Sequence, residues 1–234
     1  MEGYGGSEGE EGGGGTQRPL EALEFLTQDA EPSGTTLVDA RNGFNELSRL
    51  VMLWTVRHRW PAGARFAFNC YKNWAQLLLR QPGELSVTIL SREGVTQGDP
   101  LSMVLYGTTL VPLTEELRAA DPRLLSLFYA DDAAFDGSAR CSAHLLKLLT
   151  KRGPDRGYFP KPAKSLFISD TSGQEAGAKR AFAEEGLVLN FVSGHRYLGA
   201  YLGLQAELEA WVKPQVEAWA QGVKVLAKIA RWHS

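Results

Sequence analysis

Hydrophobic positions along the chain follow two spacings, one typical of helices and one typical of strands. Apolar residues recur at helical spacing over residues 20–31, 45–80, 101–119, 143–151, 174–185 and the last thirty residues. A Trp-Pro-Ala-Gly sequence at residues 60–63 predicts a break in the second of these helices. β-Branched or alternating runs predict strands at residues 35–38, 85–90, 124–130, 133–135, 165–169 and 187–191. This mixture of helices and short strands favours an α+β or α/β sandwich.

The two ends of the chain differ in composition from its middle. Twelve of the first fifteen residues are Gly or Glu, so we expect residues 1–18 to form a disordered tail. In the last thirty residues, one helical face carries Leu208, Val212, Val216, Trp219, Val223, Leu226 and Ala230. We therefore expect one domain over residues 19–204, followed by a helical extension over residues 205–234.

Charge, cysteine and histidine content exclude several classes of protein. The net charge is −2, but four of the 27 acidic residues lie in the first fifteen, which contain no base, so the remainder is slightly basic. Cys70 and Cys141 lie 71 positions apart and provide no disulfide framework, and the four scattered histidines lack zinc-ligand spacing. The sequence shows neither an apolar run of membrane-spanning length nor the pattern of a secretory signal. We expect an intracellular protein, nuclear or cytoplasmic, without a membrane partner.

Three carboxylates lie where predicted strands end. Asp39 follows one strand, and Asp131 and Asp132 lie at the tip of a predicted hairpin. Turns accept Asp readily, which explains each residue taken alone. Together, Asp39 and Asp131 on neighbouring strands would suit a pair of divalent ions, because Mg²⁺ prefers a few carboxylate oxygens completed by substrate phosphates.

One longer segment gives these carboxylates a context. Residues 94–102 contain Gln-Gly-Asp-Pro-Leu-Ser followed by an apolar helix, a match too long for chance. Here the chain resembles the reverse transcriptase family, particularly the non-LTR retrotransposon and group II intron type. The resemblance covers about residues 35–204. Its ordered motifs lie at residues 38–45, 94–102, 128–132 and 160–165, with a primer-grip-like hairpin at residues 197–203.

The resemblance implies roles in nucleotidyl transfer. Asp39 and Asp131 would ligate two Mg²⁺ ions, with Mn²⁺ as an alternative. Asp132 would be the second member of the acidic pair, ligating metal or supporting its geometry. Lys164 would neutralise or protonate the leaving pyrophosphate, although a lysine in a loop is also explained as a solvated side chain.

The resemblance also implies residues that contact substrate and primer. Phe44 matches the aromatic gate that selects deoxynucleotides, although it could equally be a core aromatic. Arg41, Gln97 and Gly98 would contact the nucleotide and template. Two residues of the hairpin, Tyr197 and Gly199, would place the primer end. Tyr129 is expected to serve packing rather than chemistry.

Residues 47–83 contain no acid, and their basic residues are interleaved with aromatic ones. Such residues could neutralise phosphates and stack on unpaired bases. Alternatively, the aromatics belong to a core and the arginines are solvated. A second basic stretch, at residues 147–164, could follow a primer or template backbone.

The resemblance implies an α+β polymerase palm, a small antiparallel sheet backed by helices, with the fingers and thumb largely missing. Only 38 residues precede Asp39, and one predicted helix follows residue 204. The expected function is template-directed DNA synthesis by a retroelement fragment or remnant, acting on an RNA or DNA template with a primer and deoxynucleotide triphosphates. A second chain could supply the missing fingers or thumb. The alternative is a catalytically inactive nucleic-acid-binding remnant.

Overall fold

The computed structural model describes residues 31–80, 82 and 86–232. The chain divides into two units, Met1–Glu31 and Pro32–Ser234, and the structure below is that of the second. The predicted tail at residues 1–18 lies outside the described residues, as does the predicted helix at residues 20–31 except for Glu31. Within the described part of the chain, no helix has the length and apolar character needed to cross a membrane.

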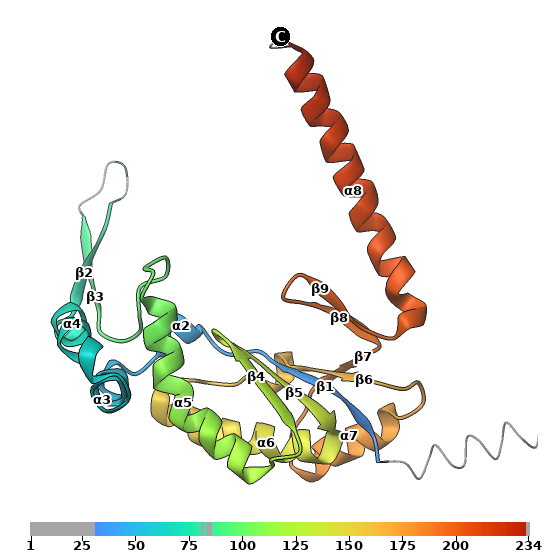
Figure 1. The fold of residues 1–234 in the computed structure, drawn as a ribbon, viewed down its shortest axis with the longest axis horizontal. Coiled ribbons are helices and arrows are strands. Elements are labelled where there is room, and N and C mark those ends of the chain that lie inside the picture. The colour runs from blue at the N-terminus through green and yellow to red at the C-terminus, as the bar shows by residue number, and fades with distance from the viewer. Residues whose placement is uncertain (1–30, 81, 83–85, 233–234) are drawn as a thin grey trace, which may run out of the picture. The chain divides into compact units, whose positions relative to one another are not determined.

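A five-stranded sheet organises the second unit, with strand order β4-β5-β1-β6-β7 (Figure 1). Its strands are β1 (Ser33–Val38), β4 (Leu125–Tyr129), β5 (Asp132–Ser138), β6 (Leu166–Ser169) and β7 (Asn190–Val192). All pairings are antiparallel except that of β6 with β7. Leu37 on β1 pairs with Ala134 on one side and Leu166 on the other. The expected α+β class, a small sheet that is mostly antiparallel, is confirmed.

Helices α5 (Ser102–Ala120), α6 (Ala139–Arg152) and α7 (Glu175–Glu184) form the layer behind this sheet (Figure 1). Phe135 and Phe167 point from the sheet into the shared core, where Leu113, Leu146 and Phe182 are fully buried. Burying such side chains is the main free-energy gain of the fold. These helices were predicted, but α6 begins at Ala139, four residues early, where the preceding serine caps it.

The opposite face of the sheet is only partly covered. Tyr197 and Leu202, from the hairpin β8 (Gly194–Tyr197) and β9 (Ala200–Gly203), pack against Leu37 and its neighbours in the central strands. On β4 the same face carries Leu125, Leu127 and Tyr129, whose side chains are more than half exposed. Tyr129, which was expected to serve packing rather than chemistry, is therefore not packed in the core, because β4 is an edge strand.

The helix predicted over residues 45–80 is only partly correct. The structure has α2 (Gly43–Glu46), α3 (Arg49–Arg59) and α4 (Pro61–Tyr71), with the predicted break between α3 and α4 at Trp60. Beyond α4, strand β2 (Ala75–Leu79) pairs with β3 (Val87–Ser91) in a separate hairpin. A short apolar run such as Leu77-Leu78-Leu79 fits a helix or a strand, and pairing with β3 decides for the strand.

The final helix, α8 (Gln205–Trp232), confirms the predicted helical extension over its described residues. It follows β9 directly and contacts that strand. The ring of Trp211 lies 5.3 Å from that of Tyr201 on β9.

A charged clamp fixes the connection from α5 into β4, the strand that leads to the acidic pair. The buried Asp121 accepts hydrogen bonds from the backbone N–H of Arg123 at 3.1 Å and from its guanidinium at 3.2 and 3.3 Å. Hydrogen bonding to Arg123, followed by that to Cys141, lowers the pKa of Asp121 to about 2. The carboxylate form therefore stabilises this turn.

We predict that Asp121→Asn lowers the free energy of unfolding at neutral pH. Because the folded-state pKa of Asp121 is depressed, its contribution is present above the ordinary value near 3.8 and is lost as pH falls toward about 2. In urea unfolding at several pH values, the difference in free energy of unfolding between wild type and Asp121→Asn should shrink over that window. A difference that stays constant down to pH 2 would contradict the clamp. As a control, replacement of the exposed Asp170 by Asn should change the free energy of unfolding little.

Candidate functional site

The three predicted carboxylates meet at one end of the sheet. Val38 pairs with Ala133, so Asp39 at the end of β1 lies beside Asp132 at the start of β5. Asp131 occupies the turn before β5. Burial first, and then the negative charges of Asp131 and Asp39, raise the pKa of Asp132. The site therefore concentrates negative charge that favours a cation or a proton.

The turn that carries Asp131 is tight and strained. Ala130 has a φ of 55°, a left-handed conformation that costs a residue with a Cβ about 1–2 kcal/mol. The hydroxyl of the fully buried Tyr158 donates a hydrogen bond to the carbonyl oxygen of Asp131 at 2.8 Å. This contact from the interior holds the strained turn in place. Sequence reasoning missed Tyr158, since nothing distinguishes it from other core aromatics.

The lysine-motif segment holds Asp39 through its backbone. The N–H of Asp39 donates to the Ser165 hydroxyl at 3.2 Å, and the N–H of Lys161 donates to the Asp39 carbonyl at 2.8 Å. The buried Ser165 in turn donates to the Lys161 carbonyl at 3.0 Å. Ser165 was also missed as a functional residue, although it ends the motif that the sequence indicated.

A cleft of about 210 Å³ opens beside these carboxylates. It gathers four predicted residues, Asp39, Asp132, Lys164 and Tyr197, from segments far apart in the sequence. Its other lining residues are Leu37, Val38, Leu166, His195, Arg196 and Leu198. Two of these, His195 and Arg196, add basic groups that the motifs did not indicate.

The β8–β9 turn projects beside this cleft. Leu198 and Gly199 have φ values of 46° and 88°, as a two-residue turn with both central residues left-handed requires. Leu198 is 55% exposed. The neighbouring Tyr197 hydroxyl is buried without a hydrogen-bond partner among the described residues, and burial followed by the charge of Asp132 raises its pKa.

The second motif contacts the first through its backbone. Val95 N–H donates to the Phe44 carbonyl and Gly94 N–H to the Leu47 carbonyl, both at 2.8 Å. The half-buried Phe44 ring stacks on Tyr106 of α5 with centroids 4.9 Å apart. The position of the predicted gate is therefore fixed by the second motif and by α5.

Tyr106 is a further residue that sequence reasoning missed. Its buried hydroxyl has no hydrogen-bond partner among the described residues, and burial followed by the charges of Asp131 and Asp132 raises its pKa. A Cβ at Gly43 would lie 2.8 Å from this hydroxyl and 2.5 Å from the Asp131 Cβ. Glycine at position 43 thus permits the close approach of the first motif to the acidic turn.

None of the four predicted substrate residues lines the cleft, and neither do Asp131 and Gly199. Phe44 stacks on Tyr106. Gln97 and Gly98 are exposed at the tip of the loop before α5. Arg41 pairs with Glu46 at 2.8 Å and lies over the Phe159 ring, 4.6 Å from its centroid.

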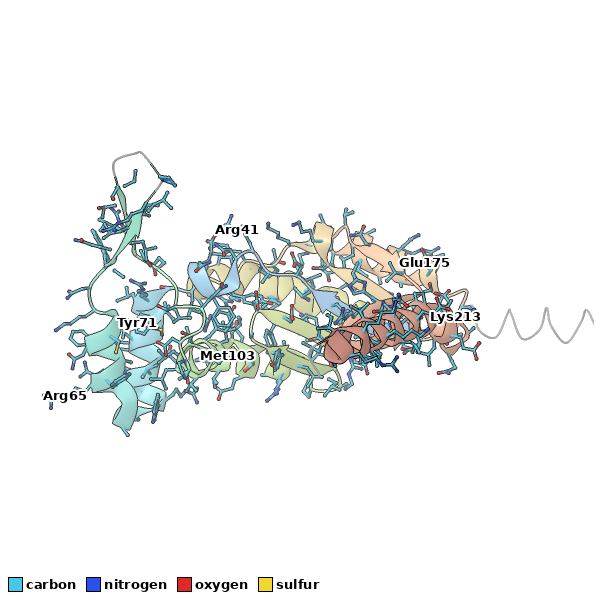
Figure 2. All side chains as sticks on the ribbon, turned by 90° about the horizontal axis from the view of Figure 1, so that it is seen from above. Arg41, Arg65, Tyr71, Met103, Glu175 and Lys213 are labelled. Atoms are coloured by element: carbon cyan, nitrogen blue, oxygen red, sulfur yellow. The ribbon has the colours of Figure 1, made fainter. Side chains whose placement is uncertain are left out.

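The basic and aromatic segment divides between core and surface. Arg49 is buried and donates to the carbonyls of Gly94 and Ser91 at 2.8 Å, so its role is structural. Tyr71 is also buried, whereas Arg65 projects outward from α4 (Figure 2). The exposed aromatics are Trp54, Phe66, Phe68 and Trp74. Part of the segment therefore belongs to the core, and part is an exposed surface that could contact nucleic acid.

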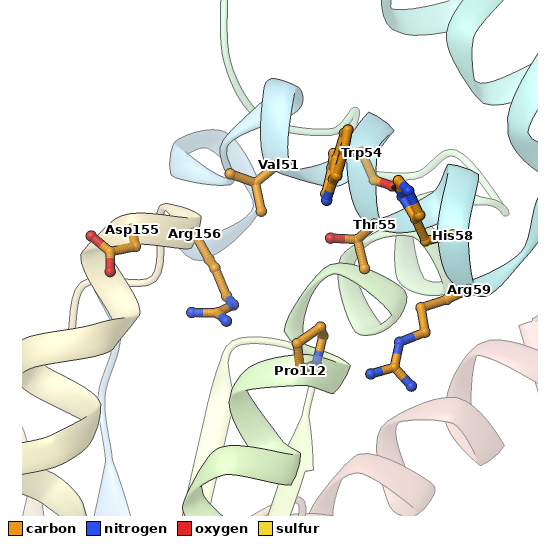
Figure 3. A pocket seen from close by; sticks show the side chains of 8 residues that line it. All are labelled: Val51, Trp54, Thr55, His58, Arg59, Pro112, Asp155 and Arg156. Carbon is orange, nitrogen blue, oxygen red and sulfur yellow. Dashed lines mark hydrogen bonds between the residues drawn. The ribbon is translucent and has the colours of Figure 1, made fainter.

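A second hollow, of about 380 Å³, lies between α3, α5 and the 3-10 turn η1 (Gly153–Arg156) (Figure 3). Trp54 stacks against His58 with centroids 4.2 Å apart, and Arg59 forms a two-pronged pair with Glu115 at 2.5 and 3.0 Å. None of the predicted catalytic or substrate residues lines it.

Over residues 31–80, 82 and 86–232, no three His, Cys, Asp or Glu side chains are grouped closely enough to hold a metal ion. Two carboxylates completed by substrate phosphates form the kind of Mg²⁺ site that enzymes acting on nucleotides use. Asp39 and Asp132, which line the cleft, supply carboxylate oxygens of the kind that such a two-carboxylate site uses.

Comparison with known proteins supports the fold. No protein-family model and no curated protein matches the chain. Apo telomerase from Candida tropicalis, truncated from its C-terminal domain, aligns with a TM-score of 0.52 at 13% identity, over 80% of this chain and 37% of that one. Telomerase from the same organism, in complex with a TWJ fragment of telomeric RNA, aligns with a TM-score of 0.50 at 14% identity, over 67% of this chain and 29% of that one.

The chain thus spans about a third of the length of these structures. Telomerase is a reverse transcriptase, so the likeness shows a reverse-transcriptase-like fold and supports the palm-like α+β class. The non-LTR or group II intron type stays a prediction.

We predict that Gly94→Ala destabilises the fold far more than Gly98→Ala. Both glycines have positive φ, +79° and +88°. A Cβ at Gly94 would lie 2.5 Å from the Phe44 carbonyl oxygen, whereas a Cβ at Gly98 would have no described atom within 4 Å apart from its chain neighbours. Backbone strain alone costs about 1 kcal/mol, and the clash should raise the loss at Gly94 to about 2–4 kcal/mol. Chemical denaturation measures both variants, and equal losses would contradict this packing of the two motifs.

Proposed function

We propose that this chain is the palm of a reverse transcriptase and carries the residues for template-directed DNA synthesis. The observation that supports this proposal best is the convergence of Asp39, Asp132 and Lys164 on one cleft, with Asp131 in the adjoining turn. Four ordered sequence motifs contribute to or brace this site, and the fold is reverse-transcriptase-like.

In the proposed reaction, the 3′-hydroxyl of a primer attacks the α-phosphate of a deoxynucleotide in line, and pyrophosphate leaves. Asp39 and Asp131 would hold Mg²⁺, with Asp132 supporting or sharing the ligation. Bound there, Mg²⁺ would stabilise charge on the attacking and leaving oxygens. Lys164 lines the cleft and would neutralise the pyrophosphate as it leaves.

The surrounding residues would position the substrates. Tyr197 lines the cleft with Asp39 and Asp132, and together with the turn at Gly199 it would place the primer end. Phe44 would exclude the ribose 2′-hydroxyl. Gln97 and Gly98 lie at the exposed loop tip, so they would contact template and nucleotide only if the loop closes or if further polypeptide completes the site. Since the chain spans about a third of the telomerase structures, a further segment or a second chain would supply fingers and thumb.

The alternative is a catalytically inactive nucleic-acid-binding protein. The exposed aromatic side chains of α3, α4 and the residues after them favour it, because Trp54, Phe66 and Trp74 are each more than half exposed within a segment rich in bases. The guanidinium of Arg92 lies over the Trp74 ring, 4.3 Å from its centroid. Such a surface can stack on unpaired bases and neutralise phosphates without turnover.

We predict that the purified chain extends a DNA primer on an RNA template with deoxynucleotides and Mg²⁺. Asp131→Asn should lower the rate on the order of 10²–10³-fold, because it removes a charge that holds the metal. Asp155→Asn, an exposed carboxyl on η1, is the matched control and should leave the rate unchanged.

Two outcomes would contradict the proposal in different ways. Equal extension by wild type and Asp131→Asn would mean that the site is assigned wrongly. No extension by either, with salt-sensitive duplex binding that survives the substitution, would favour the binding protein, provided that candidate fingers added in trans also fail to restore synthesis.

We further predict that Phe44→Ala admits ribonucleotides. Removing the ring should raise ribonucleotide relative to deoxynucleotide incorporation by about 10–100-fold, as loss of a steric contact allows. Single-nucleotide incorporation measures this ratio, which is insensitive to any general loss caused by removing the stack on Tyr106. Phe44→Tyr keeps the ring and should keep the selection, while an unchanged ratio in Phe44→Ala would assign Phe44 to packing alone.

A further inference from the structure

The hollow between α3, α5 and η1 has walls that the chain fixes at two points. The Ser48 N–H donates to the Arg156 carbonyl at 3.0 Å, which holds η1 against the start of α3. The two-pronged pair of Arg59 with Glu115 joins the end of α3 to α5. The volume of about 380 Å³ lies in the range of sites that bind small ligands. This hollow therefore offers a preformed space of ligand size.

One wall contains a buried hydroxyl that lacks a partner. Thr55, on the face of α3 that lines the hollow, is 5% exposed. The helical residues Thr109 and Thr150 donate to a carbonyl of the preceding turn at 2.6 and 2.7 Å. The Thr55 hydroxyl makes no hydrogen bond to any described residue and points into the hollow (Figure 3). Because a buried polar group without a partner costs free energy, a ligand that bonds this hydroxyl is favoured.

A guanidinium without a carboxylate partner lines the same space. Arg156 is half-buried and forms no ion pair with a described residue, and its guanidinium points from η1 into the hollow (Figure 3). The carboxylate of the neighbouring Asp155 points the other way and takes no part (Figure 3). The planar fork of an arginine matches the oxygens of a phosphate, so an unpaired and half-buried guanidinium favours such an anion.

An exposed indole adjoins these two polar groups. Trp54 also lines the hollow and is 65% exposed. The His58 ring lies 4.2 Å from it between centroids, and His58 Nδ1 donates to the Trp54 carbonyl at 2.7 Å, which holds the two rings together. Val51 and Pro112 add apolar wall. An indole held in this way is a surface on which an unpaired base can stack.

We propose that this hollow binds one unpaired nucleotide of a single-stranded nucleic acid. Its base would stack on Trp54, and its phosphate would bond the Arg156 guanidinium and the Thr55 hydroxyl. A guanidinium, a hydroxyl and an exposed indole together recognise a phosphate next to a planar base. The hollow shares no lining residue with the cleft at the carboxylates, so this is a separate site.

The surroundings of the hollow favour a nucleic acid over an acidic peptide. Residues 47–83, which supply the α3 wall, contain no acid, and further aromatics are exposed on α4 at Phe66 and Phe68. Exposed aromatic side chains among basic ones are the pattern that single-stranded nucleic acids bind. The inference deepens the nucleic-acid binding that both proposed functions include, and it does not rest on polymerase chemistry.

The test is binding of a fluorescein-labelled single-stranded oligoadenylate of about eight nucleotides to the full chain, without Mg²⁺, primer or deoxynucleotides. Trp54→Leu should weaken binding about tenfold, because the base loses its stacking partner. Arg156→Gln should weaken binding and lower the slope of log affinity against log salt by about 0.7, the value for one phosphate contact. Thr55→Val keeps the shape of the side chain, removes the hydroxyl and should weaken binding about threefold.

Two matched controls remove the same chemical groups elsewhere. Trp219→Leu removes an indole that is 70% exposed on α8, and Arg140→Gln removes an exposed guanidinium on α6. Neither residue lines the hollow, and both variants should bind as wild type does. Circular dichroism checks that every variant is folded.

Photocrosslinking locates the contact without any substitution. The same oligonucleotide carrying one 4-thiouridine is irradiated with wild-type chain, and the crosslinked peptide is identified by mass spectrometry. The crosslink should fall on α3 or η1, and this test holds even if Trp54→Leu does not fold.

Four results would overturn the proposal. Equal affinity of wild type, Trp54→Leu and Arg156→Gln would place the single strand elsewhere. Inorganic phosphate that competes as well as adenosine monophosphate would leave an anion site without base recognition. Free adenosine monophosphate that binds as tightly as the oligoadenylate would indicate a free-nucleotide site. An oligoglutamate peptide that binds through Trp54 and Arg156, while the oligoadenylate does not bind, would assign the hollow to an acidic protein.

None of these measurements involves DNA synthesis. Primer extension and binding at the hollow can therefore fail separately, and a failure of one leaves the test of the other intact.

Discussion

Holding three carboxylates together at one end of a small sheet opposes their mutual repulsion, and much of the surrounding structure serves this constraint. Burial is the larger cause of the raised pKa of Asp132, and this repulsion from Asp131 and Asp39 adds to it. Opposing it are backbone contacts from the interior, since Tyr158 holds the acidic turn and Ser165 holds the end of β1.

The motifs by which this chain resembles reverse transcriptases are held in place largely through their backbones. Gly94 allows the second motif to bond to the strand-end segment that carries Phe44, and Ser165 ties the lysine motif to Asp39. Only Lys164 of the lysine motif brings a charged side chain into the cleft. A motif can therefore stay recognisable because its backbone geometry is demanding, whether or not each of its side chains touches substrate.

Two apolar surfaces are exposed in the described part of the chain. On the sheet, Leu125, Leu127 and Tyr129 leave an apolar face beside the cleft, and α8 leaves a longer stripe. The chain spans about a third of the telomerase structures that share its fold.

The sequence alone determined most helices and the strand ends at Asp39 and Asp131, because these follow from local periodicity. Its short ordered motifs determined the α+β class and indicated Lys164 and Tyr197. It did not determine that Leu77 and its neighbours form a strand, since a short apolar run suits either structure until a partner strand is present. Nor could it single out Tyr106, Tyr158 or Ser165, whose roles arise from contacts across many positions of the chain. The tertiary structure alone decided these, because contacts between residues far apart in the sequence exist only once the chain has folded.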